Sequence, residues 1–255
     1  MKAAAWIASS TLLGLVACGD GGSGNSVNLP SGGSVGLQGA YYGTTANDIA
    51  FDTLILDSGR FYVLYGDRVG DALAVRGFIE GSGTSNNGSF SSTNAKDFSD
   101  GTNTTSTISI SYGTGTGITG NLVVNTDPPA TDSFSALPVT TGYSYGTAAK
   151  LSDIAGAWNL TAVGGEAVSI NISSTGALTA NLNGCSLTGT VTPRQSRRNV
   201  FDVDLAFGNE TACVRPNETA NGNAISYLLT DGRRQIVIAG TNTARDAGTA
   251  LFGVR

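Results

Sequence analysis

The stretch FDVDLAF at residues 201–207 carries the pattern that decides the fold. Every second residue from Phe201 to Phe207 is large and apolar, and the residues between them are two aspartates and an alanine. The same alternation appears in VSINI at 168–172 and in ISISY at 108–112. Successive side chains of an extended strand point to opposite faces, so this period of two predicts strands that each turn one face toward a core.

Turn signals separate these runs. Asn-Gly at 87–88 and 183–184 and Asp-Gly at 231–232 favour tight hairpin turns, because these residues accept a positive φ at low cost. In the second half, the pattern predicts eight strands, near residues 156–163, 166–173, 176–183, 185–192, 200–208, 223–230, 233–241 and 248–254. The first half predicts about eight more strands, ending near Thr140. Only residues 147–154 are helix-like, over a turn or two.

Eight short antiparallel strands within about 105 residues fit a small up-and-down barrel, in which closure removes the exposed edges. A sandwich of two sheets fits nearly as well, because alternation along each strand is the same in both architectures. The prediction is therefore an all-β chain with two tandem small antiparallel β-barrels joined by a short helical turn, with β-sandwiches as the alternative. The two β-domains are expected at residues 37–146 and 147–255.

The two halves begin alike. A Gly-Ala-aromatic triplet starts at Gly39 and another starts at Gly156, and in each half a glycine follows twenty residues later, at Gly59 and at Gly176. Each of these later glycines follows a serine or threonine in a predicted turn between two strand-like runs. The match indicates an internal duplication.

Composition narrows the function classes. Gly accounts for 36 of 255 residues, charged residues for 13% and hydrophobic residues for 40%, which argues against a disordered chain and against helical bundles. The chain contains no His, and this absence removes most familiar catalytic designs. Residues 37–140 hold four basic and ten acidic residues, a net charge of −6, while residues 141–255 hold nine basic and eight acidic residues, a net charge of +1. Neither half has the dense positive charge that nucleic-acid binding requires.

The first residues predict export. One lysine is followed by an uncharged, mostly apolar run at 3–16, which is too short for a spanning helix but fits a secretory signal. The run ends in LVAC at 15–18, which resembles the lipobox of bacterial lipoprotein precursors. That resemblance implies removal of residues 1–17 as a signal peptide and acylation of Cys18, palmitate included, as a membrane anchor. The alternative is a plain secretory signal cleaved near Ala17.

The resemblance also bears on localisation. In enterobacterial lipoproteins, an Asp directly after the lipidated cysteine favours retention at the inner membrane. Gly19 stands there in this chain, which favours the outer membrane, facing either the periplasm or the cell exterior. Residues 18–36 are rich in Gly and Ser and predict a flexible tether with a root-mean-square span of about 24 Å.

The cysteine count is consistent with this assignment. With Cys18 assigned to the lipid, Cys185 and Cys213 remain, and in an oxidising compartment we expect them to form a disulfide. In a meander, the start of the fourth strand and the loop after the fifth lie at the same end, so the bond is geometrically allowed. The alternative is a metal site, but two thiols without any imidazole do not complete one. We therefore expect neither a metal nor a cofactor.

Three glycine motifs have a simpler explanation than catalysis. GxSxG occurs at 32–36 and at 142–146, but a nucleophile elbow needs a strand-to-helix turn and a His to take the serine proton. GxGxxG occurs at 115–120, but a strand pattern follows it instead of the helix that a dinucleotide site requires. These matches are expected by chance in a chain rich in Gly and Ser.

Carboxylates provide further candidates. Asp67 with Asp71, or Asp202 with Asp204, could serve as an acid–base pair of the kind that glycosidases use. The stretch at 97–103 offers oxygen ligands for Ca²⁺, but it lacks the spacing and the closing Glu of an EF-hand. We expect all of these acids to be solvated surface groups, as exposed charges usually are.

A basic cluster is the most distinctive candidate site. Arg194, Arg197 and Arg198 fall between the fourth and fifth strands of the second half, and Arg233 and Arg234 follow the turn between the sixth and seventh. In a meander, both turns emerge at the same end of the barrel, opposite the predicted disulfide. Five guanidinium groups there could bind the phosphate or carboxylate groups of a lipid headgroup or an acidic polysaccharide. The alternative is charge at hairpin tips that keeps the protein soluble.

The layout as a whole resembles the two-barrel surface lipoproteins of Gram-negative bacteria, such as the transferrin-binding and factor-H-binding lipoproteins. The resemblance rests on layout without a shared motif, so the ligands of those proteins are not carried over. The expected function is a non-enzymatic binding or structural role in the cell envelope, with an envelope or surface ligand as partner.

Two other functions remain open. One is a carrier of a lipid or another apolar molecule inside a barrel, although Phe201, Leu205, Phe207 and Tyr227 are expected to point inward and mostly fill the second barrel. The other is a carboxylate-dependent glycan hydrolase.

Overall fold

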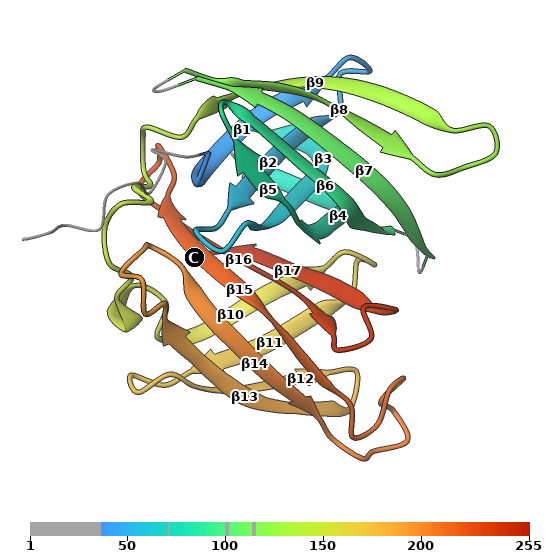
Figure 1. Ribbon diagram of the computed structural model, residues 1–255. Coiled ribbons are helices and arrows are strands. Elements are labelled where there is room, and N and C mark those ends of the chain that lie inside the picture. The colour runs from blue at the N-terminus through green and yellow to red at the C-terminus, as the bar shows by residue number, and fades with distance from the viewer. Residues whose placement is uncertain (1–36, 71, 100–101, 114–115) are drawn as a thin grey trace, which may run out of the picture. The chain divides into compact units, whose positions relative to one another are not determined.

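Two antiparallel β-barrels follow one another along the chain in the computed structural model, which describes residues 37–255 except 71, 100–101 and 114–115. Figure 1 colours the first barrel blue to green and the second yellow to red. The prediction of two tandem barrels is confirmed, and the sandwich alternative is wrong. The predicted signal peptide, the lipidation site Cys18 and the tether lie outside the described residues. Among the residues that are described, no helix is long and apolar enough to cross a membrane.

In the described part of the first half, nine strands are present and eight of them close a barrel. They are β1 (Gly39–Thr45), β2 (Ala50–Ile55), β3 (Arg60–Val69), β4 (Ala72–Ser82), β5 (Thr84–Asn86), β6 (Ser89–Ser99), β7 (Thr102–Tyr112), β8 (Ile118–Val124) and β9 (Ala130–Pro138). The strand order is β4-β3-β2-β1-β9-β8-β7-β6-β5, and pairing of β4 with β6 closes the barrel. The short strand β5 pairs with β6 across the Asn87-Gly88 turn, where both residues have a positive φ.

The second barrel contains eight strands in simple sequential order. They are β10 (Gly156–Ala162), β11 (Ala167–Ile172), β12 (Ala177–Leu182), β13 (Cys185–Pro193), β14 (Phe201–Phe207), β15 (Thr219–Leu228), β16 (Arg234–Asn242) and β17 (Gly248–Val254). A short 3-10 helix, η1 (Leu151–Asp153), precedes β10 within the stretch predicted to be helix-like. All eight predicted strands are present, and the largest shift is at β15, which begins at Thr219, ahead of the predicted start at residue 223.

The second barrel closes over a short seam. Strands β10 and β17 pair through two residue pairs, at Thr161 and Ala162, whereas β15 and β16 pair through nine. Side-chain contacts of the C-terminal residue add to this seam. The guanidinium of Arg255 donates to the carbonyl of Ala155 at 2.9 Å and lies 3.9 Å from the centroid of the Trp158 ring.

The two barrels share the local structure that their sequence match predicts. In each barrel, the aromatic residue of the Gly-Ala-aromatic triplet donates a hydrogen bond to the carbonyl four residues earlier. Tyr41 Oη donates to Leu37 at 3.0 Å, and Trp158 Nε1 donates to Ile154 at 2.7 Å. The same side-chain contact therefore fixes the start of the first strand in both barrels.

The glycines that follow also occupy equivalent positions. Gly59 and Gly176 each precede the third strand of their barrel, with φ of 81° and 88°. A Cβ atom would lie 2.4 Å from the carbonyl oxygen of Gly83 at the first position and 2.2 Å from that of Val191 at the second. Both turns thus require the positive φ and the close backbone approach that only glycine allows.

Alternation along the strands builds an apolar interior in each barrel. The buried core of the first barrel comprises Leu37, Phe51, Ile55, Phe61, Ile79, Phe90, Ala95, Ile108, Ile110, Ile118 and Ala136. The buried core of the second barrel comprises Ala149, Ile154, Trp158, Leu160, Ala162, Val168, Ile170, Ile172, Leu178, Val191, Phe201, Val203, Ala224, Ile236, Ile238 and Leu251. The aspartates of FDVDLAF lie on the outer face, because Phe201 and Val203 point inward.

A third apolar cluster joins outward faces of the two barrels. Its buried members from the first barrel are Leu54, Leu56, Tyr62, Leu64, Leu73, Val75, Phe78 and Phe98, and those from the second are Val200, Val237, Ala239 and Ala250. The pairing of β3 with β4 shifts register at Gly66, so Arg76 on β4 is left without a pairing partner, as in a β-bulge. Because of this extra residue, Val75 and Phe78 both point to this cluster. Because of these contacts, the two barrels belong to one compact unit.

Candidate functional site

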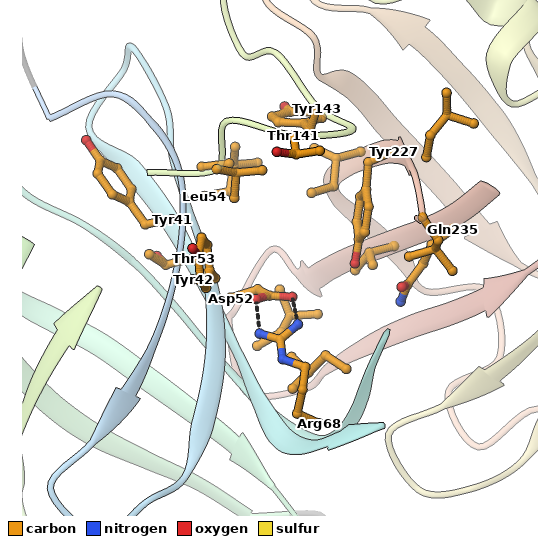
Figure 2. A pocket seen from close by; sticks show the side chains of 18 of the residues that line it. Tyr41, Tyr42, Asp52, Thr53, Leu54, Arg68, Thr141, Tyr143, Tyr227 and Gln235 are labelled. Carbon is orange, nitrogen blue, oxygen red and sulfur yellow. Dashed lines mark hydrogen bonds and ion pairs between the residues drawn. The ribbon is translucent and has the colours of Figure 1, made fainter. Parts of the chain in front are cut away.

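A pocket of about 430 Å³ lies beside this third cluster and is lined by residues of both barrels. Strands β1 to β4 of the first barrel, strands β15 and β16 of the second, and the connecting residues 139–143 contribute to its walls. Figure 2 shows the side chains that project into it. A concave site of this size, between two structural units, is where proteins commonly bind small molecules.

The walls are apolar because several strands here are buried on both faces. On β2, Phe51 and Ile55 point into the first barrel, while Leu54 points outward to the pocket. On β16, Ile236 and Val237 divide in the same way between the interior of the second barrel and the pocket. The pocket therefore presents aliphatic surface that an ordinary barrel exterior does not have.

An ion pair forms one polar group of the pocket. Asp52 on β2 and Arg68 on β3 make two contacts, with Nη2 to Oδ1 at 2.6 Å and Nη1 to Oδ2 at 3.4 Å. Burial raises the pKa of Asp52 above its usual value, although Arg68 opposes that shift. The pair places two opposite charges at the pocket without adding net charge.

A second polar group comes from the second barrel. Tyr227 and Gln235 face each other across the β15–β16 register, and both line the pocket. Figure 2 shows the Tyr227 ring beside the open space and Gln235 on the far side of that ring. Gln235 is 1% exposed, and its Oε1 has no hydrogen-bond partner among the described residues. Burial raises the pKa of Tyr227, and the charge of Asp52 raises it further, so the phenol stays protonated and able to donate.

These groups define what the pocket can hold. An unpaired buried carbonyl such as Gln235 Oε1 has a desolvation cost that a ligand N–H or O–H would remove. The tyrosine hydroxyl can donate to the same ligand. Because Asp52 and Arg68 balance each other, the pocket favours neither an anionic nor a cationic ligand. The aliphatic walls favour an apolar body. The arrangement suits a neutral, largely apolar molecule with a hydrogen-bond donor.

Three of the five arginines predicted as an anion site have polar partners inside the protein. Arg194 contacts Asp57 at 2.9 Å and Asp202 at 2.7 Å. Arg233 contacts Asp231 at 2.6 Å, and Arg234 donates to the hydroxyl of Ser226 at 3.3 Å. The ion pairs of Arg194 and Arg233 hold their guanidinium groups and reduce the net charge around them.

The other two predicted arginines differ from each other. Arg198 lies with its guanidinium 5.5 Å from the centroid of the Tyr145 ring, a stacking partner that sequence reasoning missed. Arg197 is exposed in the turn between β13 and β14, with a φ of 59°. The strand order places this turn and the β15–β16 turn at the same end of the barrel, as predicted. Binding of an anion there stays a prediction.

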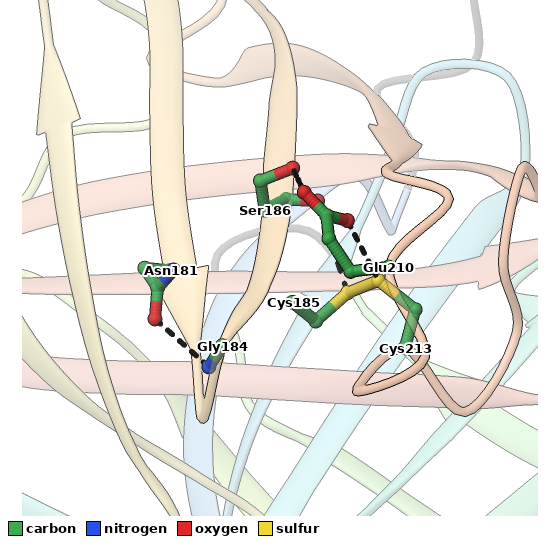
Figure 3. The surroundings of a disulfide bond; sticks show 6 residues. All are labelled: Asn181, Gly184, Cys185, Ser186, Glu210 and Cys213. Carbon is green, nitrogen blue, oxygen red and sulfur yellow. Dashed lines mark hydrogen bonds between the residues drawn. A yellow bond between two sulfur atoms is a disulfide. The ribbon is translucent and has the colours of Figure 1, made fainter.

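The predicted disulfide is present between Cys185 and Cys213, with Cα atoms 4.7 Å apart. Figure 3 shows how it joins the start of β13 to the loop after β14. Glu210 lies beside both sulfurs and accepts a hydrogen bond from Ser186, which anchors the same loop to β13. The two sulfurs are bonded to each other, so they are not available as thiolate ligands for a metal.

The carboxylate pairs take separate roles. Asp67 is exposed and pairs with exposed Arg76 at 3.4 Å, and its predicted partner Asp71 lies outside the described residues. Asp202 pairs with Arg194, whereas Asp204 is exposed on the outer face of β14. These placements agree with the expectation of surface acids.

Two expectations about individual side chains are wrong. Asp97 is not a solvated loop residue: it lies on β6, lines the interior of the first barrel and accepts a hydrogen bond from Tyr65 at 2.7 Å. Tyr227 does not fill the second barrel. It packs on the outside, because Ala224 of the same strand points inward and residues an odd number of positions away point outward.

The pocket residues Asp52, Arg68 and Gln235 were missed by sequence reasoning. A signal for them exists in the uninterrupted apolar runs FYVL at 61–64 and IVIA at 236–239, which break the alternation expected of half-exposed strands. Such runs indicate strands that are buried on both faces. They therefore mark the strands on which the second, outward contact surface lies.

Comparison with known proteins gives distant similarity only. No protein-family model matches the chain, and no curated protein matches it. Two solved structures of transferrin-binding protein B from Haemophilus parasuis, both substituted variants, are similar at 9% identity, with TM-scores of 0.25 and 0.24. The match covers 81% of this chain and 60% of each of those chains, so this chain spans about three fifths of their length. Similarity at this level carries no argument about ligand or function.

Proposed function

We propose that this chain is a non-enzymatic binding protein of the bacterial cell envelope. Its ligand is a small, neutral, largely apolar molecule that carries a hydrogen-bond donor, and its site is the pocket between the two barrels. The observation that carries the proposal is the combination of aliphatic walls with the buried, unpartnered Oε1 of Gln235.

The placement in the envelope rests on separate observations. The LVAC segment at 15–18 supports an acyl anchor on Cys18, and the Cys185–Cys213 disulfide fits an oxidising compartment outside the cytosol. With Gly19 after the cysteine, we propose the outer membrane as the anchoring membrane. Mass spectrometry of the intact protein purified from bacterial membranes tests this part, and an unacylated Cys18 would contradict it without affecting the pocket.

Ligand binding is tested with N-phenyl-1-naphthylamine, a neutral apolar fluorophore with one N–H group. The titration uses the chain from residue 18 onward, with Cys18→Ala, purified without detergent. This chain contains the whole compact unit to which both barrels belong. We expect saturable binding to one site per chain. Gln235→Met keeps the side-chain length but removes the acceptor, and it is expected to weaken binding about tenfold, or about 1.4 kcal/mol.

A second variant tests the location of the site. Ile225 lines the pocket, and Ile225→Trp is expected to fill it and abolish saturable binding. The control is Val214→Trp, because the side chain of Val214 is 96% exposed. Binding that survives Ile225→Trp unchanged, or that is lost equally in both variants, would reject the inter-barrel site.

A further inference from the structure

The first barrel contains a cavity of its own, separate from the pocket between the barrels. It measures about 170 Å³, and its lining residues include Thr45 and Ile49, at the end of the barrel where β1 turns into β2. Its walls are inward side chains of the barrel: Phe51, Ile55, Phe61, Val63, Ile79, Ile108, Ile110, Ile118, Leu122 and Phe134. An apolar cavity at a barrel mouth is a recurrent place for a small ligand.

Two carboxylates interrupt this apolar lining. Asp97 reaches the cavity from β6, and Asp132 reaches it from β9. No lysine or arginine is among the residues that line the cavity. Both acids therefore face an apolar space without a basic partner in it, which is a costly arrangement for carboxylates.

The two carboxylates are incompletely satisfied. Asp97 accepts one hydrogen bond from Tyr65, and burial raises its pKa despite that bond. Oδ1 of Asp132 is buried and has no hydrogen-bond partner among the described residues. A carboxylate has about four lone-pair sites for donors, so a cationic donor placed between such groups would stabilise both.

From this geometry we infer that the first barrel binds a primary ammonium group attached to an apolar chain. The ammonium would donate to Asp97 and Asp132, while the hydrocarbon would occupy the space among the isoleucine and phenylalanine side chains. A primary ammonium carries three N–H donors, whereas a quaternary ammonium carries none and an alcohol carries no charge. The cavity is therefore expected to distinguish these three headgroups.

Charge on the rest of the domain acts in the same direction. Residues 37–140 carry a net charge of −6, so their field attracts a cation toward the barrel before contact. The pocket between the barrels, by contrast, contains a balanced ion pair and suits a neutral molecule. The carboxylates of the amine site, Asp97 and Asp132, do not line the pocket between the barrels, so the inference does not depend on the proposed function.

The test is isothermal titration of the chain from residue 18, carrying Cys18→Ala, with three ligands that share an octyl chain: octylamine, 1-octanol and octyltrimethylammonium. We expect octylamine to bind at least tenfold more tightly than either of the others. Equal affinity for the three would overturn the inference, because the apolar wall alone would then account for binding.

Variants of the two acids locate the site. Asp132→Asn is expected to weaken octylamine binding about tenfold, and Asp97→Asn is expected to do the same, while 1-octanol binding changes little. Asp204→Asn is the matched control, since Asp204 is exposed on the other barrel. If Asp97→Asn does not fold, Asp132→Asn and the headgroup comparison in the parent chain still decide the matter. If the aspartate variants lose octylamine binding but keep N-phenyl-1-naphthylamine binding, the amine site is separate from the inter-barrel pocket. Unchanged octylamine binding by Asp132→Asn would refute the amine site.

Discussion

Arg245, in the turn between β16 and β17, places its Nε 2.6 Å from Oε2 of Glu80 on β4 of the other barrel. Glu80 is 3% exposed, and its other oxygen is held by Arg60 at 2.8 Å. Arg245 also donates to the backbone carbonyls of Glu80 and Asn94, both at 2.9 Å. One buried carboxylate thus connects an arginine of its own barrel with an arginine of the neighbouring barrel.

Removal of this connection should destabilise the protein. Arg245→Ala leaves Glu80 buried with one cation instead of two, and the expected loss in the free energy of unfolding is about 2–3 kcal/mol. Arg76→Ala is the control, because Arg76 and its partner Asp67 are both exposed, and it should cost less than about 0.5 kcal/mol. Urea unfolding followed by circular dichroism measures both. Equal losses in the two variants would show that burial of Glu80 contributes nothing.

Glycine substitution separates backbone strain from steric overlap. Gly176 and Gly165 have nearly the same φ, 88° and 89°, but a Cβ would lie 2.2 Å from the carbonyl oxygen of Val191 at Gly176 and would meet nothing within 4 Å at Gly165. Gly165→Ala is therefore expected to cost about 1 kcal/mol from φ alone, and Gly176→Ala about 2–4 kcal/mol. Thermal unfolding of the two variants checks the order, and a smaller loss at Gly176 would contradict it.

The disulfide should stabilise the second barrel. Cys185 and Cys213 are 28 residues apart. A crosslink over such a loop lowers the entropy of the unfolded chain, which stabilises the folded state by about 3–4 kcal/mol at 25 °C. We expect the double variant Cys185→Ser, Cys213→Ser to lose a comparable amount in urea unfolding. The parent chain treated with a reductant provides the control. If reduction lowers stability but the double variant does not lose further on reduction, the effect belongs to this bond.

One ion pair predicts a dependence of stability on pH. Burial alone would raise the pKa of Asp57, but hydrogen bonds from Ser196 and Arg194 and the charge of Arg194 hold it below its usual value of 3.8. A depressed folded-state pKa stabilises the protein above the unfolded value, and this stabilisation is lost as pH falls below about 3.8. Asp57→Asn should therefore cost about 1 kcal/mol or less at pH 7 and less than that at pH 2. A difference that grows toward low pH would reverse the assigned sign.

The architecture of the second barrel follows closely from its sequence. Alternation in FDVDLAF predicts a strand, and the Asn183-Gly184 pair predicts a tight turn. Eight strands joined by such turns are expected to pair in sequential order. The start of β15 was missed because residues 217–223 are rich in Asn, Gly and Thr, which read as a turn. Pairing with β14 and β16 outweighs that local preference from Thr219 onward.

The candidate pockets could not be derived in the same way. Tyr227 was expected to point inward but lies on the outer face, and alternation along single strands does not reveal that the outer faces of two barrels meet. The contact depends on residues distant in sequence, such as Glu80 and Arg245, and on a register shift at Gly66 that no local pattern announces. Asp97 was misplaced for a related reason, since a polar residue in a polar stretch gives no sign that it points inward.

The short seam between β10 and β17 has a consequence for the closure of the second barrel. The ladder between β10 and β17 consists of two residue pairs, at Thr161 and Ala162, extended by the hydrogen bond from Val163 N to the carbonyl of Ala250, whereas every other joint in this barrel has a longer ladder. The joint between β10 and β17 is therefore the weakest ladder of this barrel, and the guanidinium of Arg255, 3.9 Å from the centroid of the Trp158 ring, adds a side-chain contact across it.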